Sequence, residues 1–379
     1  MSQSQSRFRR QTAGRARQRG AARRGSSGQL HKDFRAARGA GPQHWSGRRI
    51  IPTHSLGKEG LRDGPGSAHL NGKRESAMTE AVEIARGLTA KPDLYAALRG
   101  LAGASPEVDL PEIYAALDAS AEGRETARRL KAVDQGLLRA VMRRGRGMTA
   151  TPAEADVRAH LLGQLPAPLF LPEIASSPSL AVLTGGQHPA MPAFSDPAFD
   201  AWFAAQGVTY GLGPYGEKRS VYQTDQFADT ASPERRTLHL GIDVFAPAMI
   251  PVYAPLAGRV RHLTYNADPL DYGNTLILEH QAGNALFFTL YGHLAGTLPE
   301  LLAVGDSVQA GQHIAHLGDW HENGGWAAHI HFQIMTDMLD QSGNFFGVGH
   351  ESLWDVWQGI CIDPNLVLRL PADRFTLID

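Results

Sequence analysis

The chain has 379 residues and a formal net charge of -1, which leaves room for two or three compact units. This near-neutral total hides an uneven distribution, because residues 1–77 hold 17 Lys and Arg against 4 Asp and Glu. The single cysteine, Cys361, excludes an intrachain disulfide. No run of about 18 apolar residues is present, so the sequence predicts no transmembrane segment.

Residues 1–77 are rich in Arg, Gly, Ser and Gln and have almost no aliphatic periodicity. Such a segment buries too little apolar surface to offset its ordering entropy, which predicts a disordered basic extension. One interpretation is a basic arm for nucleic acid or an anionic surface. The favoured one is a non-functional extension ahead of a start at Met78, so nucleic acid is not an expected partner. A secretory signal requires an apolar stretch after its basic residues, and none follows these arginines. This pattern favours a cytoplasmic protein.

Residues 78–165 have the apolar spacing of helices, with steps of three and four residues. The pattern predicts a small helical segment with breaks at 103–106, at Gly123 and at 144–152. No chemical motif is found in it. Its apolar positions are Ala81, Ile84, Ala85, Leu88, Leu94, Leu98, Leu101, Ile113, Leu117, Leu130, Val133, Leu137, Leu138 and Val141.

Residues 166–236 are rich in Pro, Ser and Gly, which predicts a long connection with short ordered pieces. Within it, residues 211–222 have the Gly and Tyr content of a loop that lies against a binding groove, although a surface loop would have the same composition. From Thr237 to about residue 372 the period changes to two, as in Val252, Ala254 and Leu256. Short apolar runs separated by glycines predict a β-sandwich or barrel.

The β-rich part contains an unusual set of histidines. His329 and His331 are two residues apart in an apolar run, so in a strand both imidazoles face one way. His239 and Asp243 share a face if their segment is extended, and Gly241 between them disfavours a helix. Two imidazoles and one carboxylate suit Zn²⁺ and leave a fourth position for water or substrate. Each pair alone is more often structural, and the argument depends on their joint occurrence.

At these positions the sequence resembles the lysostaphin-like, LytM-type zinc metallopeptidases, which cleave peptidoglycan cross-bridges. The resemblance covers roughly residues 237–335. Four blocks carry it: Gly241 to Gly258, Tyr291-Gly-His293-Leu294, Val304 to Gln312, and Ala328 to Ile334.

The resemblance implies that His239, Asp243 and His331 bind zinc and that His293 and His329 are the catalytic histidines. It also implies an antiparallel β-sandwich of the duplicated hybrid type over 237–372, hence a multidomain α plus β chain. The implied activity is a zinc metalloendopeptidase that hydrolyses a peptide bond, in peptidoglycan or a related peptide, by attack of zinc-bound water. Such an enzyme would be periplasmic or extracellular, against the location that the N-terminus favours.

A second resemblance links residues 323–333 and 361–366 to the peptidase-like middle segment of large proteins that also carry a kinase-like and a pyridoxal-phosphate aminotransferase domain. Residues 78–165 are too short for a kinase-like domain. Two other readings compete with the enzyme. A biotinyl or lipoyl carrier would need a lysine in an exposed hairpin, but the only lysine after residue 200 is Lys218. A zinc-binding module with a regulatory role and no turnover stays open.

Overall fold

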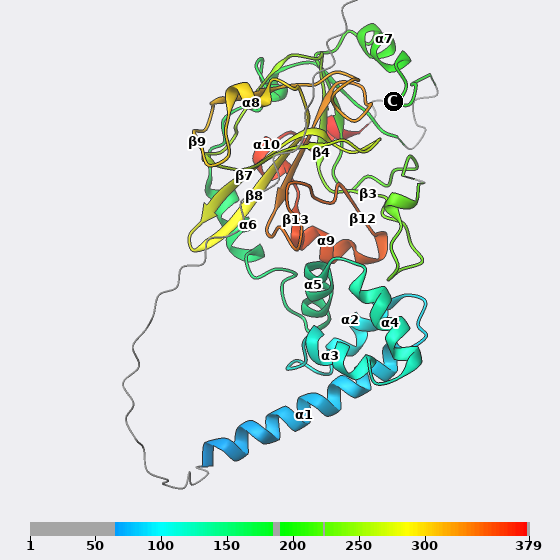
Figure 1. The fold of residues 1–379 in the computed structure, drawn as a ribbon. Coiled ribbons are helices and arrows are strands. Elements are labelled where there is room, and N and C mark those ends of the chain that lie inside the picture. The colour runs from blue at the N-terminus through cyan, green and yellow to red at the C-terminus, as the bar shows by residue number, and fades with distance from the viewer. Residues whose placement is uncertain (1–64, 185–189, 223, 377–379) are drawn as a thin grey trace, which may run out of the picture. The chain divides into compact units, whose positions relative to one another are not determined.

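The computed structural model describes residues 65–184, 190–222 and 224–376, and the predicted disorder of residues 1–64 lies outside them (Figure 1). The described part has α-helices before and after a group of β-strands. The helices are α1 (Pro65–Leu88), α2 (Leu94–Ala102), α3 (Leu110–Leu117), α4 (Ala121–Lys131), α5 (Gln135–Gly145), α6 (Glu154–Gly163), α7 (Ala198–Ala205), α8 (Leu298–Leu301), α9 (Trp354–Ile360) and α10 (Asn365–Leu368). None of these helices is long and apolar enough to cross a membrane.

The strands are concentrated after residue 237, as predicted, and a few short ones lie elsewhere. They are β1 (Ser179–Ala181), β2 (Tyr210–Gly213), β3 (Leu238–His239), β4 (Ile242–Phe245), β5 (Pro251–Tyr253), β6 (Gly258–Asn266), β7 (Gly273–Ala282), β8 (Ala285–Leu294), β9 (Ser307–Val308), β10 (His313–His316), β11 (His329–Met335), β12 (Val348–Gly349) and β13 (Cys361–Ile362).

The N-terminal helices begin where the sequence supplies caps. The side chain of Asp93 accepts a hydrogen bond from the backbone N–H of Ala96 at the start of α2, and Asp109 forms a capping box with Glu112 at the start of α3. Ser120 and Asp134 cap α4 and α5 in the same way. These side chains satisfy N–H groups that have no partner within the helix. The predicted helical segment is therefore confirmed.

Two details of the helical prediction were wrong. Helix α1 begins at Pro65, inside the segment expected to be disordered. Ala81, Ile84 and Leu88 are buried, and a helix anchored by such packing extends at little further cost in free energy. Gly123 does not end a helix but lies in the first turn of α4, where a Cβ would meet the carbonyl oxygen of Leu117.

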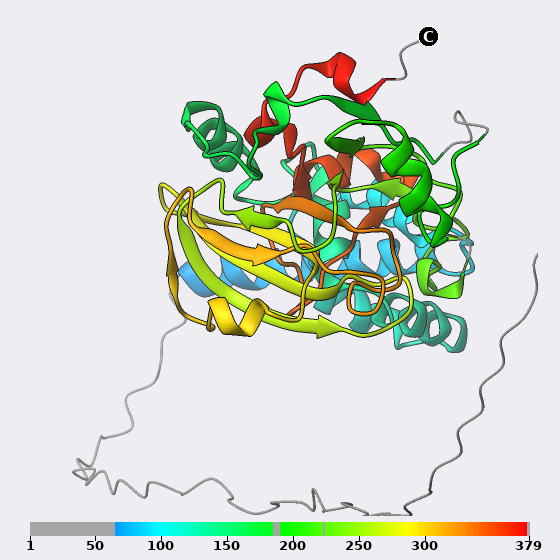
Figure 2. The ribbon, with the colours of Figure 1, turned by 90° about the horizontal axis from the view of Figure 1, so that it is seen from above.

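The main sheet has nine strands within the described residues, in the order β1-β2-β4-β11-β8-β7-β6-β9 with β13 paired to β11. All pairs are antiparallel except β1 with β2, so the sheet is mixed. The connection 166–236 thus supplies two strands of this sheet. Figure 2 shows the long strands β6, β7 and β8 side by side in green and yellow. The sandwich of duplicated halves stays a prediction.

Alternate residues of the central strands face two apolar clusters, as a period of two requires. On β7, Leu276 and Leu278 pack with the strands β5 and β10, whereas Ile277 packs with the N-terminal helices and Trp357 of α9. Helix α9 contacts both α5 and β13 and so links the helical part to the sheet (Figure 1). The sheet is therefore covered on both faces.

His280 on β7 predicts a loss of stability in mild acid. Burial lowers its pKa from 6.5 to about 4, and its Nδ1–H donates to the Ala257 carbonyl at 2.8 Å. The unfolded chain takes up a proton at His280 near pH 6.5, and the folded chain does so only near pH 4. The contribution of His280 to stability is therefore complete above pH 6.5 and is lost as the pH falls below that value. We expect His280 alone to contribute a loss of about 2 kcal/mol in the free energy of unfolding between pH 7 and pH 5.

Urea unfolding at the two pH values measures this loss. In a His280→Gln variant the dependence on pH should be weaker by that amount. Equal dependence on pH in the wild type and the His280→Gln variant would contradict the assignment.

Candidate metal centre

Three strands bring the predicted metal-binding residues together. Strand β11 lies between β4 and β8, and His331 is paired with Asp243 on one side and with Gly292 on the other. His239 reaches the same place from β3. Gly241 lies against the His331 ring, where a Cβ would meet imidazole atoms at 2.6 Å. A residue without a side chain is therefore needed between His239 and Asp243.

The three predicted ligands form a nearly equilateral triangle of donor atoms. His239 Nε2 lies 3.0 Å from His331 Nδ1 and 3.2 Å from Asp243 Oδ1, and His331 Nδ1 lies 3.1 Å from Asp243 Oδ1. Ligand atoms about 2.0 Å from a tetrahedral zinc lie about 3.3 Å apart. The triangle thus has the dimensions of three corners of a zinc tetrahedron, and all three residues are buried.

The opposite ring nitrogens of both histidines are held by hydrogen bonds. His239 Nδ1 donates to the carbonyl oxygen of Pro214 at 2.9 Å, and His331 Nε2 donates to Gln333 Oε1 at 2.8 Å. In neutral rings this leaves His239 Nε2 and His331 Nδ1 as lone pairs. Two nitrogen lone pairs and a carboxylate oxygen therefore converge at about 3 Å, which is a favourable arrangement only around a cation.

The protonation states of the site also favour a bound cation. Burial, and after it the neighbouring Arg219, lowers the pKa of His239 from 6.5 to about 4. Burial would raise the pKa of Asp243, but His239 and Arg219 outweigh it and hold that pKa well below its ordinary value. At neutral pH the site therefore presents a neutral imidazole and an ionised carboxylate, the forms that bind a metal ion.

The two predicted catalytic histidines lie beside the triangle. The rings of His293 and His329 are 4.2 Å apart between centroids, and His329 Nε2 is 4.0 Å from Asp243 Oδ1. Each ring donates from Nδ1 to a backbone carbonyl at 2.7 Å, His293 to Asn323 and His329 to Ala327. Both Nε2 atoms are thereby left as acceptors. Burial lowers the pKa of both rings, most strongly that of His293.

His293 has an unusual backbone conformation, with φ of 63°. The left-handed region costs a non-glycine residue roughly 1–3 kcal/mol and occurs where surrounding contacts enforce it. Here the N–H of His293 donates to the Tyr272 carbonyl at 2.8 Å and its own carbonyl accepts from Gly318 at 2.9 Å. The strain therefore lies at a residue of the site, where backbone outliers tend to cluster.

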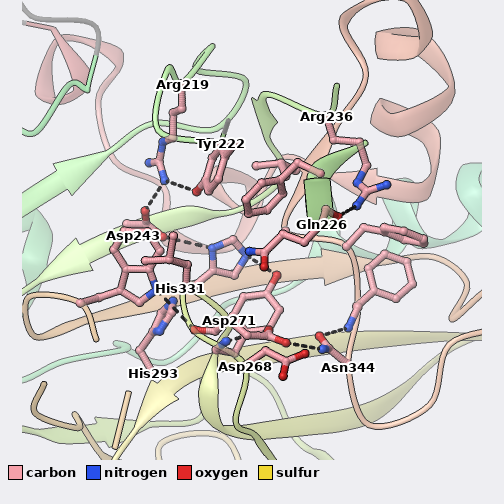
Figure 3. Close-up of a pocket in the computed structure, with 18 of the residues that line it drawn as sticks. Arg219, Tyr222, Gln226, Arg236, Asp243, Asp268, Asp271, His293, His331 and Asn344 are labelled. Atoms are coloured by element: carbon pink, nitrogen blue, oxygen red, sulfur yellow. Dashed lines mark hydrogen bonds and ion pairs between the residues drawn. The ribbon is translucent and has the colours of Figure 1, made fainter. Parts of the chain in front are cut away.

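The site includes residues that the sequence analysis did not single out. Arg219 lies 2.7 Å from Asp243 Oδ2 and 2.8 Å from Glu217, and all three are largely buried (Figure 3). Gln333 lies on the same face of β11 as His329 and His331, four and two residues away, so the alternation of a strand could have predicted it. Arg219 and Glu217 have no comparable signal.

A pocket of about 250 Å³ opens beside the triangle. Arg219 and Tyr222 line it, so the segment 211–222 does lie against a groove, as hypothesised (Figure 3). Phe194 closes one side, with its ring 5.0 Å from Trp326 and 6.2 Å from His329. The remaining walls combine aromatic and polar side chains, among them Phe227, Arg236, Asp268, Asp271, Tyr272, Asn344, Phe345 and Phe346.

Comparisons with known proteins agree with this site. The model of peptidase family M23 matches residues 237–342. Among solved structures, a zinc-containing peptidase from Vibrio cholerae is 32% identical over 26% of this chain and 28% of its own, with a TM-score of 0.22. The catalytic domain of the antimicrobial peptidase lysostaphin from Staphylococcus simulans is 23% identical over 45% of this chain and 96% of its own, with a TM-score of 0.28.

LytU is 25% identical over 39% of this chain and 88% of its own, with a TM-score of 0.24. The chain thus spans less than a third of the Vibrio cholerae peptidase. No curated protein matches it. The three predicted metal ligands and the two predicted catalytic histidines all lie inside the matched segment. Residues 237–342 are therefore a peptidase family M23 domain, which confirms the resemblance to the lysostaphin/LytM-type peptidases.

Proposed function

We propose that the chain is a zinc metalloendopeptidase that hydrolyses a peptide bond in peptidoglycan cross-bridges or a related peptide. The observation that carries the proposal is the triangle of His239 Nε2, His331 Nδ1 and Asp243 Oδ1, with sides of 3.0 to 3.2 Å. Three protein ligands with a pocket on the open side are the arrangement of a catalytic zinc site and not of a structural one. The family M23 match supports the substrate class.

When bound, zinc supplies a Lewis acid that activates water and polarises a carbonyl group. The other steps fall to the residues of the chain. His293 and His329 have free Nε2 atoms and low pKa values, so each is a base at neutral pH and becomes a donor after it takes a proton. In the protonated form, one of them stabilises the developing oxyanion and passes the proton to the leaving amine.

The pocket beside these histidines favours an extended peptide with small side chains. Phe194 stacks on Trp326, and its ring centroid lies 6.2 Å from that of His329, which leaves little room there for a large side chain.

The test uses the full chain, quantified for zinc and incubated with a glycine-rich peptide and with a cross-bridge peptide that contains D-Ala. We expect one zinc ion per chain and hydrolysis of one of the two. In a His329→Ala variant we expect the zinc to remain and the rate to fall about a hundredfold or more. Replacement of the exposed His321 by Ala is the matched control and should change neither.

The competing function is a zinc-binding module without turnover. Zinc in the wild-type chain, together with no hydrolysis of either peptide, would favour it over the enzyme. A chain without zinc that still cleaved the peptides would contradict both functions.

A further inference from the structure

The side chain of Arg219 forms ion pairs with two carboxylates, those of Asp243 and Glu217. Arg219 donates from Nη1 to Asp243 Oδ2 at 2.7 Å and from Nε to Glu217 Oε2 at 2.8 Å. The side chains of Arg219 and Asp243 are both 2% exposed. Glu217 is held in turn by the N–H and the hydroxyl of Thr184, both of which donate to its Oε1. A continuous polar chain thus runs from Thr184 to Asp243.

The two oxygens of Asp243 have different surroundings. Oδ1 faces His239 Nε2 at 3.2 Å and His331 Nδ1 at 3.1 Å, whereas Oδ2 is turned away from both and accepts from Arg219. A carboxylate can bind a metal ion through one oxygen or through two. A charge-assisted hydrogen bond to Oδ2 competes directly with the second mode.

We propose that Arg219, oriented by Glu217, is a positioning residue that restricts Asp243 to one metal-binding oxygen. The fork of the guanidinium serves this purpose, because it donates to both carboxylates at once in one plane. Gly213 on β2 makes the arrangement possible: it is paired with Asp243, and a Cβ there would meet Nη2 of Arg219 at 2.8 Å. Arg219 and Glu217 precede the matched segment 237–342.

The proposal predicts the sign of a change in metal affinity. A cation close to a metal site repels the metal ion, so charge alone predicts that an Arg219→Ala variant binds zinc more tightly. Loss of positioning predicts the opposite, because residues that orient metal ligands typically contribute about 10- to 100-fold to affinity or activity. We therefore expect weaker zinc binding in this variant, by about that factor.

The experiment measures zinc affinity of the full chain by competition with a chromophoric chelator and records the visible spectrum of the Co²⁺-substituted protein. In Arg219→Ala the cobalt absorption should weaken as the second Asp243 oxygen joins the metal and coordination rises above four. Arg219→Lys keeps the charge but not the fork, so it should share the defect. Glu217→Gln should show it to a smaller degree. Added guanidinium ion, at a concentration that does not denature, should restore Arg219→Ala but not Arg219→Lys.

Two results would overturn the proposal. One is an Arg219→Ala chain that binds zinc as tightly as the wild type, or more tightly, with an unchanged cobalt spectrum. The other is a defect that guanidinium does not reverse, which would indicate misfolding in place of lost positioning. The proposal rests on the metal site of the proposed function but not on turnover. A wild-type chain that bound no metal would refute both, whereas equal metal binding by wild type and variant would refute only the role of Arg219.

Discussion

Replacing His331 with alanine should remove the metal ion from the chain and lower peptide hydrolysis by at least about a thousandfold. The variant loses one of the three proposed ligand atoms and leaves Asp243 and His239 without the third corner of their triangle. A metal ion that polarises a carbonyl group and activates water contributes several kcal/mol to a transition state, and about 4 kcal/mol corresponds to a factor of about a thousand. Zinc content and the initial rate of cross-bridge cleavage measure the two effects.

Because His331 is buried, its removal also leaves a cavity, and a second variant separates the two causes. Asp243→Asn keeps the size of the side chain and removes its negative charge, while the amide oxygen can still accept a hydrogen bond from Arg219. Both variants should lose the metal, while circular dichroism should show that Asp243→Asn remains folded. Full activity of a zinc-free variant at either position would refute the metal-dependent mechanism.

Replacing Trp357 with alanine should lower the free energy of unfolding by about 3–5 kcal/mol, the range for large aromatic residues in a core. Trp357 is 0% exposed on α9 and lies in the apolar cluster that joins the N-terminal helices to the sheet. The backbone of Gly349 on β12 lies directly against its ring, where a Cβ would meet indole atoms at 2.5 Å. Since β12 pairs with β3, the strand of His239, the loss should reach the metal site.

Chemical unfolding followed by circular dichroism measures this loss, and Trp357→Phe is the matched control. The indole Nε1 has no hydrogen-bond partner among the described residues, so phenylalanine sacrifices ring volume but no polar contact. We expect roughly 1 kcal/mol for that change. Equal stabilities of the two variants would mean that the ring does not anchor the helices to the sheet.

Local spacing predicted two pairs of candidate residues, and the family resemblance singled out His239, Asp243 and His331 among them, which the structure brings together. His329 and His331 share a strand face, and the glycine between His239 and Asp243 disfavours a helix. The helical segment was predictable for the same reason, since the repeats of three and four residues that include Ile84 and Leu138 mark buried faces. The extended backbone and the buried helix faces in the structure agree with both patterns.

Residues that act across distant segments were not predictable. Arg219 and Glu217 contact Asp243 through ion pairs, which leave no periodicity in the sequence. The carbonyls of Pro214 and Ala327 orient two imidazoles, and any residue type offers a carbonyl. Strand β1 has only three residues and acquires its structure from pairing with β2, about thirty positions later, which a short window of sequence cannot reveal.

The two ends of the main sheet differ from its middle in a way that bears on solubility. The outermost strands, β1 and β9, have three and two residues, whereas β7 and β8 between them have ten each. Arg374 also covers the neighbourhood of β1, where it donates to the hydroxyl of Ser179 and to the carbonyl of Ser177. A long unpaired outer strand is a template for intermolecular pairing. With outer strands this short, the sheet offers other chains few free backbone groups from which aggregates could grow.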